Sequence, residues 1–213
     1  MISIDERVLV IVGENTADEI RAAAQRNSVE PWDRIEKIWF DIDAPARSLQ
    51  PILQEHKLAK FIVGIAEPDL RRAAVAAAEA AGLIAVSVID PSASIDPLAR
   101  IAPGCFVAAN AVVSSRAQLH GHVMVHFNAS VGHDSQIGEY AVVLPGARVS
   151  GQVSVGESAM VGSNAFIYQG VKVGSAARID ALTYVREDLP DRRTISVRRP
   201  EAHQLKIPTD NHQ

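Results

Sequence analysis

The pair His133-Asp134 is the feature of the sequence best suited to chemistry. It stands in the stretch Ser130-Val131-Gly132-His133-Asp134-Ser135-Gln136-Ile137-Gly138. An imidazole titrates near neutrality, and a neighbouring carboxylate favours its protonated form. A histidine in this setting can take a proton from an attacking amine or hydroxyl, as a general base does. The spacing alone favours the alternative, a solvated histidine at a corner of the repeat.

Four of the seven histidines lie between positions 120 and 133 and raise the alternative of a metal site. Metal ligands must converge on one point of the fold. In the six-residue repeat described below, His120 and His126 share a phase but fall on different faces, and His122 and His133 hold other phases. The sequence therefore predicts a site without a metal ion.

A six-residue repeat occupies the C-terminal half of the chain. Every sixth residue from Ile95 to Val185 is Ile, Leu or Val, and the residue two places before each is small in nearly every case, from Ala93 to Thr183. This period fits neither an amphipathic helix nor a flat strand. It fits a triangular coil of three hexapeptides, in which each residue stacks on the one eighteen positions later at the strand spacing of roughly 4.8 Å. We predict an all-β domain over 91–186, a left-handed parallel β-helix of about five coils.

Five glycines directly follow the aliphatic position. Either close approach of neighbouring backbones or an unusual φ would require glycine there. They are Gly132, Gly138, Gly156, Gly162 and Gly174.

The N-terminal part has a different pattern, in which short apolar runs alternate with helix-like stretches. The runs predict strands over 8–12, 37–40, 61–65 and 83–89, and the stretches between them predict helices over 16–26, 44–55 and 67–81. Such alternation is typical of a parallel sheet with right-handed crossovers. We expect an α/β Rossmann-like domain over 1–90.

The C-terminal extension over 187–213 begins where the repeat ends. Asp188-Leu189-Pro190-Asp191 indicates a turn before a short extended tail.

Composition restricts the class of protein. A net charge of −4 gives no basic face for a nucleic acid, and Cys105 alone cannot form an intrachain disulfide. The sequence shows neither a signal peptide nor an apolar run of spanning length. We expect a cytoplasmic protein with no membrane partner.

Residues 130–174 resemble the two-domain hexapeptide acyltransferases that acetylate nucleotide-linked amino sugars or sialic acid. The resemblance lies in SVGHDSQIGEYAVVLPGARVSGQVSVGESAMVGSNAFIYQGVKVG. It implies that His133 is the catalytic base and Asp134 its modulator. It also implies a homotrimer with acetyl-CoA, or another acyl-CoA, in the groove between adjacent prisms. The CoA-lining positions that it implies are Val142, Gly151 and Ser163.

The same resemblance places the acceptor, a nucleotide sugar, on the N-terminal domain. Ligands of open parallel sheets bind at the C-terminal ends of the strands. The positions expected there are Gly13, Glu14, Asn15, Asp41 and Gly64.

The sequence departs from the family pattern at three places. The loop that follows the first strand has one glycine and two acids over 13–18, and such acids repel a diphosphate. His126 stands where the family has Asn. Arg198-Arg199-Pro200-Glu201 replaces the Gly-x-Pro-Ala stretch that borders CoA.

Three functions fit these observations. The first is an acyl-CoA-dependent N- or O-acyltransferase in which His133 deprotonates the acceptor and backbone amides near Gly151 stabilise the oxyanion. The second is a catalytically silent trimeric scaffold or nucleotide-binding regulator, which the altered loops favour. The third is a metal-dependent hydratase, which the phases of the histidines disfavour.

Overall fold

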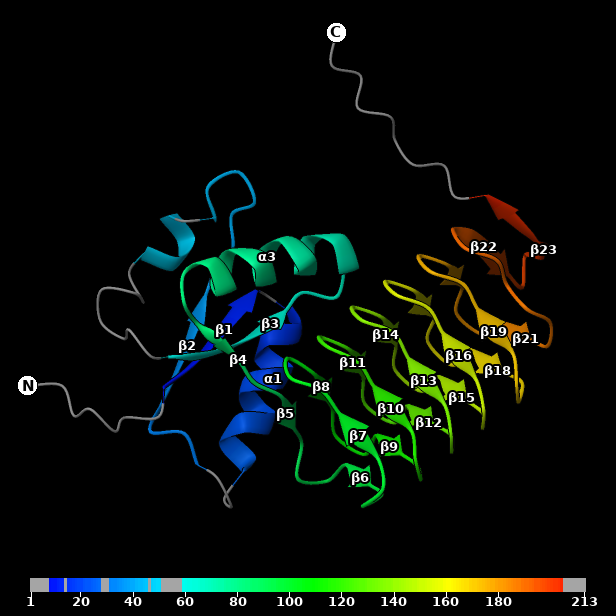
Figure 1. Cartoon of the computed structure of the whole chain (residues 1–213), viewed down its shortest axis with the longest axis horizontal. Coiled ribbons are helices and arrows are strands. Elements are labelled where there is room, and N and C mark those ends of the chain that lie inside the picture. The colour runs from blue at the N-terminus through cyan, green and yellow to red at the C-terminus, as the bar shows by residue number, and fades with distance from the viewer. Residues whose placement is uncertain (1–7, 14, 28–30, 46, 51–58, 205–213) are drawn as a thin grey trace, which may run out of the picture.

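The structure, a computed structural model, describes residues 8–13, 15–27, 31–45, 47–50 and 59–204 (Figure 1). Side chains are described over the same ranges, except for those of Asn15 and residues 199–204. None of the described helices is both long and apolar enough to cross a bilayer.

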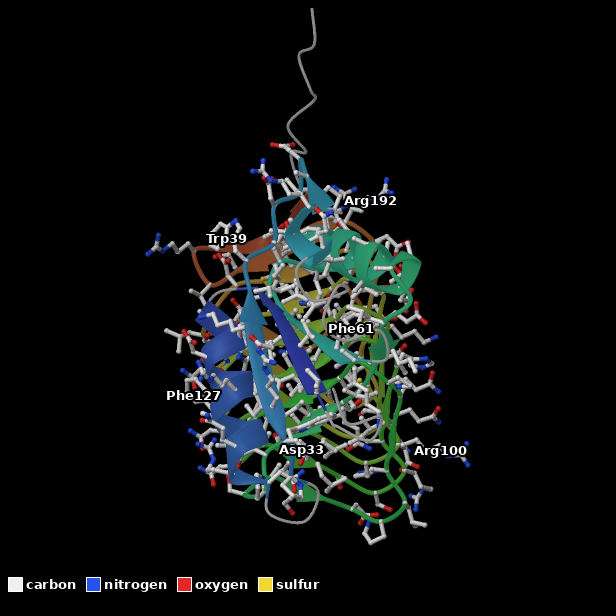
Figure 2. The ribbon with its side chains drawn as sticks, turned by 90° about the vertical axis from the view of Figure 1, so that its left-hand side faces the viewer. Asp33, Trp39, Phe61, Arg100, Phe127 and Arg192 are labelled. Carbon is white, nitrogen blue, oxygen red and sulfur yellow. The ribbon has the colours of Figure 1, made fainter. Side chains whose placement is uncertain are left out.

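The N-terminal part is a four-stranded parallel sheet with two long helices. Its elements are β1 (Val8–Gly13), α1 (Asn15–Arg26), β2 (Arg34–Ile38), β3 (Lys60–Gly64), α3 (Pro68–Ala80) and β4 (Ile84–Ala85). The strand order is β2-β1-β3-β4, so the fully buried β1 lies inside the sheet. Figure 2 shows this sheet in front of the solenoid, with α1 on the left and α3 on the right.

The predicted elements differ from the observed ones at two strands. β2 begins at Arg34 and ends at Ile38, so Trp39 and Phe40 lie beyond its end. The predicted strand over 83–89 is divided, because β4 pairs with β3 whereas the next strand joins the solenoid. Of the predicted helix over 44–55, residues 45 and 47–50 are helical, and 46 and 51–55 lie outside the described residues.

The C-terminal half is a parallel β-solenoid of the kind that a left-handed β-helix forms, with three flat faces. Face I contains β5 (Val88–Ile89), β8 (Phe106–Val107), β11 (Met124–Val125), β14 (Val142–Val143), β17 (Met160–Val161), β20 (Arg178–Ile179), β22 (Arg193–Ser196) and β23 (Arg199–Gln204). Face II contains β6 (Ser94–Ile95), β9 (Val112–Val113), β12 (Ser130–Val131), β15 (Arg148–Val149), β18 (Phe166–Ile167) and β21 (Tyr184–Val185). Face III contains β7 (Arg100–Ile101), β10 (Gln118–Leu119), β13 (Gln136–Ile137), β16 (Ser154–Val155) and β19 (Lys172–Val173).

The strand register confirms the eighteen-residue coil. Val131 pairs with Val149 on face II, and Ile137 pairs with Val155 on face III. The aliphatic and small columns form one continuous core inside the prism. The solenoid extends beyond the predicted limits of 91 and 186, because β5 pairs with β8 at its start and β22 with β20 at its end.

The corners explain the glycines. Every sixth residue from Gly104 to Leu182 has a φ between 54° and 78°, the left-handed region, and this position lies three places after the aliphatic one. The glycines one place after the aliphatic position serve close approach instead. A Cβ on Gly132, for example, would lie 2.4 Å from the carbonyl carbon of Ser150 in the next coil.

The N-terminal sheet and α1 pack on face I. Leu9, Ile11 and Ile20 share a buried cluster with Phe106 and Met124 of that face.

A buried arginine fastens α3 to the same region. The Arg71 guanidinium donates to the carbonyl oxygens of Ile65 (2.7 Å) and Ala66 (3.0 Å) and to that of Tyr140 in the solenoid. Burial lowers the pKa of Arg71 to about 10, which leaves the side chain charged at neutral pH. Its two terminal nitrogens thus join α3 to the solenoid, whereas the buried Nε has no hydrogen-bond partner among the described residues.

Candidate active site

His133 and Asp134 lie at a corner of the prism, between β12 on face II and β13 on face III. Gly132 brings the chain close to the next coil, and Asp134 then turns it with a φ of 59°. Both side chains project outward, and His133 Nδ1 lies 2.8 Å from Asp134 Oδ2. The structure therefore brings the predicted base and its modulator into direct contact.

Arg116, which the sequence analysis missed, holds the carboxylate from the coil before. It lies eighteen residues earlier, at the same corner, and its Nε and Nη2 donate to Asp134 Oδ1 and Oδ2 at 2.6 and 3.0 Å. Hydrogen bonds from Arg116 and then from His133 lower the pKa of Asp134 to about 2. Asp134 is therefore a carboxylate at every pH at which an imidazole titrates.

Gly151 lies directly under the imidazole in the following coil. A Cβ on this residue would stand 2.4 Å from His133 Nε2, so only glycine leaves the ring in place. The backbone N–H of Gly151 donates to no carbonyl of the described chain, whereas those of Ser150 and Gln152 donate to Ile167 and His133. A free amide therefore lies beside the one ring nitrogen that does not face Asp134.

Val142 and Ser163 do not lie beside His133 in a single chain. Val142 projects from face I and is fully buried against the N-terminal part, with Leu9 and Phe106 in the same cluster. Ser163 follows β17 and stands at the corner between faces I and II. The sequence could not show that Val142 is buried, because the six-residue phase does not say which face the N-terminal part covers. It could have placed Ser163 at another corner, since thirty residues separate it from His133 and the coil repeats every eighteen.

A second candidate site lies at the C-terminal edge of the parallel sheet. A cavity of about 230 Å³ opens there, and Gly13 and Gly64 line it as expected. The two strand ends meet closely, since a Cβ on Gly13 would lie 2.8 Å from the Gly64 carbonyl oxygen. The remaining lining residues, which the sequence did not reveal, are Thr16, Trp39, Phe40, Ile65, Ala66 and Leu70.

The other residues expected at this edge are only partly described. Glu14 and the side chain of Asn15 lie outside the described residues. Asp41 is exposed beside the cavity, next to Phe40, and its Oδ1 accepts a hydrogen bond from the Asp43 amide at 3.0 Å. Trp39 is 62% exposed and lies on the upper left side of the molecule in Figure 2.

Of the remaining clustered histidines, His120 is exposed, whereas His122 and His126 serve packing. His126 is buried between the solenoid and α1, with Nδ1 3.5 Å from Glu19 Oε2. His122 stacks on Tyr140, and burial followed by the charge of Arg71 lowers the pKa of His122 to about 4. No group of three or more metal-ligating side chains gathers anywhere in the described ranges.

Comparison with known proteins gives structural matches only. No protein-family model and no curated protein sequence matches the chain. Among solved structures, the acetyltransferase domain of PglB from Neisseria gonorrhoeae, in complex with acetyl coenzyme A, is 25% identical. That match has a TM-score of 0.80 and covers 94% of this chain and 100% of the other.

Two further matches show the same fold. A variant of perosamine N-acetyltransferase from Caulobacter crescentus, in complex with CoA and GDP-perosamine, is 24% identical, with a TM-score of 0.81, and covers 95% of this chain and 99% of the other. WeeI from Acinetobacter baumannii is 18% identical, with a TM-score of 0.81. That match covers 93% of this chain and 100% of the other.

These matches extend over both the N-terminal sheet and the solenoid, so the likeness is not confined to the repeat. The resemblance that residues 130–174 indicated is confirmed at the level of the whole chain. In fold and in repeat pattern, the chain is similar to the hexapeptide-repeat sugar N-acetyltransferases.

Proposed function

We propose that this chain is an acetyltransferase that moves the acetyl group of acetyl-CoA to an amino or hydroxyl group of a nucleotide-linked sugar. One observation carries the proposal. His133 faces Asp134 through Nδ1 and keeps Nε2 free above Gly151, on a solenoid similar to that of an acetyltransferase domain bound to acetyl coenzyme A. A protein that served only as a scaffold would not need this arrangement.

The chemistry follows from the two ring nitrogens. Asp134 accepts a hydrogen bond from Nδ1–H, which leaves the Nε2 lone pair to take the acceptor's proton as its nitrogen or oxygen attacks the thioester carbonyl. In this proposal the backbone amide of Gly151, which donates to no carbonyl of the described chain, stabilises the oxyanion. When the C–S bond breaks, His133 returns the proton to the sulfur, and CoA leaves as a thiol.

The acceptor is proposed to bind on the N-terminal part, which we interpret as a Rossmann-like domain over about 1–90. Its cavity lies at the C-terminal edge of parallel strands, where such sheets bind ligands. The exposed ring of Trp39 offers a surface on which a base can stack. The perosamine N-acetyltransferase structure contains a GDP-linked sugar, which supports a nucleotide sugar as acceptor.

One chain does not form the whole proposed site. The N-terminal part packs on face I, and His133 lies at the edge between faces II and III, on the far side of the prism. An acceptor held at the sheet of one chain must therefore reach His133 of another copy. This requirement supports a homotrimer.

The exposed side chains of face II fit such an assembly. Val112, Phe166 and Tyr184 project from it and are 40%, 42% and 54% exposed, with Leu182 and Tyr168 at its two edges. Its other outward residues are Ser94, Ser130 and Arg148, so the apolar surface gathers toward the C-terminal coils. The outward residues of face III are all polar, namely Arg100, Gln118, Gln136, Ser154 and Lys172. An exposed apolar surface of this kind marks a contact between proteins.

Closed cyclic symmetry would join the two edges of face II. The edge with His133 on one copy would meet the edge with Ser163 on its neighbour, and the groove between them would hold acetyl-CoA over Gly151. Val142 lies outside this groove because the N-terminal part buries it, so we leave it out of the proposed CoA site.

The proposal is tested by mixing the protein with acetyl-CoA and a panel of UDP- and GDP-linked amino sugars while free thiol is followed. Cys105, the chain's own thiol, is buried, and burial raises the pKa of Cys105 to about 11, so the background stays low. We expect thiol release that depends on one class of acceptor. Tight CoA binding without release from any acceptor would favour the silent scaffold instead.

A further inference from the structure

The corner that carries His133 contains an ion pair between consecutive coils. Arg116 and Asp134 are eighteen residues apart and stack at one corner, where both have a left-handed backbone. The guanidinium runs along the prism axis and makes two parallel hydrogen bonds to one carboxylate. Its third nitrogen, Nη1, lies 3.4 Å from Ser115 Oγ.

One carboxylate oxygen joins the arginine to the histidine. Asp134 Oδ2 accepts from Arg116 Nη2 at 3.0 Å and faces His133 Nδ1 at 2.8 Å. Rotation of this carboxylate about its last bond would break both arginine hydrogen bonds, so the pair favours one orientation of the carboxylate. The direction of Oδ2 toward the ring is therefore set from the preceding coil.

We propose that Arg116 is a positioning residue for the base: it fixes the Asp134 carboxylate so that Nδ1 of His133 keeps its proton and Nε2 stays free. This inference rests on the proposed function and names a further residue of the same site. Arg116 itself does not touch the reacting atoms.

A purely structural role explains the pair less well. Arg116 and Asp134 are 60% and 33% exposed, and exposed pairs add little to the stability of a fold. The following coils do without such a pair at this corner, where Gln152 and Gly170 occupy the same position. Among the ion pairs of the described residues, the Arg116–Asp134 pair is the one that joins the same corner of two consecutive coils. It lies at the corner that carries His133.

The groups around the imidazole indicate what each substitution should do to the ring. The charged groups near it are Asp134 and Arg116, with Asp96 acting on Arg116 from farther along the corner, and the following coil presents the neutral Gly151 and Gln152. Asp134 accepts from Nδ1–H, and Arg116 orients the Asp134 carboxylate. Removing either side chain should therefore move the proton of the neutral ring from Nδ1 toward Nε2.

The test compares Arg116→Gln, Arg116→Lys and Asp134→Asn. Two quantities are measured for each variant: the ¹⁵N NMR spectrum of the histidine-labelled protein and kcat. The ¹⁵N spectrum of labelled His133 reports which ring nitrogen carries the proton. In Arg116→Gln we expect a larger share of neutral rings with the proton on Nε2, and kcat to fall about tenfold with KM for acetyl-CoA nearly unchanged. Asp134→Asn should move the ring proton in the same direction. Arg116→Lys restores the charge but not the two parallel bonds, so the ring proton should stay displaced and kcat should stay low.

The matched control is Arg100→Gln, an exposed arginine on face III, which should change neither quantity. If Arg116→Gln alters the melting temperature but leaves kcat and the position of the ring proton unchanged, the pair is structural and the proposal fails. Full kcat in Arg116→Lys would also overturn it, because charge alone would then suffice. The NMR spectrum is recorded without substrate, so it tests the role of Arg116 even if the proposed transfer reaction is wrong.

Discussion

Faces II and III of the solenoid are built on the same inward columns yet differ in their outward residues. Their inward residues, such as Val131 and Ile137, are aliphatic and fully buried. Outward, face II carries two serines and an arginine in its first coils and then Phe166 and Tyr184, whose ring centroids are 5.6 Å apart. Face III carries amides, serine and charged residues throughout. The aliphatic and small residues that recur every six positions determine the coil, because they fill its interior. The outward residues between them can vary, and they can form an interface or a site.

The largest effect is expected from a change in the inward aliphatic column, which the faces of the prism share. Val143→Asp places a charge inside the prism, at a fully buried position where nothing can pair with it. We expect loss of soluble expression.

The control for that variant changes the outward column instead. Gln136→Asp, on face III, should express and melt like the wild type. A normal melting curve for Val143→Asp, measured by circular dichroism, would show that the inward column is assigned to the wrong residues.

A second prediction concerns the outward residues, in which faces II and III differ. Phe166→Glu puts a charge on face II, and Ser154→Glu puts the same charge on face III. Light scattering should give the mass of three chains for the wild type and for Ser154→Glu, and a lower mass for Phe166→Glu, because burying an unpaired charge in an interface is unfavourable.

Two results would contradict this assignment of the interface. One is a wild-type protein with the mass of a single chain. The other is dissociation caused by Ser154→Glu and not by Phe166→Glu.

The solenoid was predictable because its signal repeats. The aliphatic position recurs from Ile95 to Val185, and each recurrence tests the same period independently. The same regularity could have revealed Arg116, since the eighteen-residue coil places it against Asp134. Spacing between ion-pair partners is therefore informative in a solenoid once the coil length is known.

The N-terminal sheet was predictable only in outline. A short apolar run such as 83–89 indicates strands but not the sheet that each one joins, and here β4 and β5 belong to different sheets. Trp39 and Phe40 line the cavity because β2 ends earlier than predicted. Contacts between the two parts, such as those of the buried Arg71, leave no periodic trace in the sequence.

The measurement that tests the central claim most directly is kcat for His133→Ala, with His126→Ala as the comparison. If His133 takes the acceptor's proton, its loss should lower kcat by about a hundredfold to ten-thousandfold, with a smaller effect on acetyl-CoA affinity. His126, buried against α1 and Glu19, should tolerate alanine far better. Near-normal turnover in His133→Ala together with loss of turnover in His126→Ala would contradict the assignment of the base.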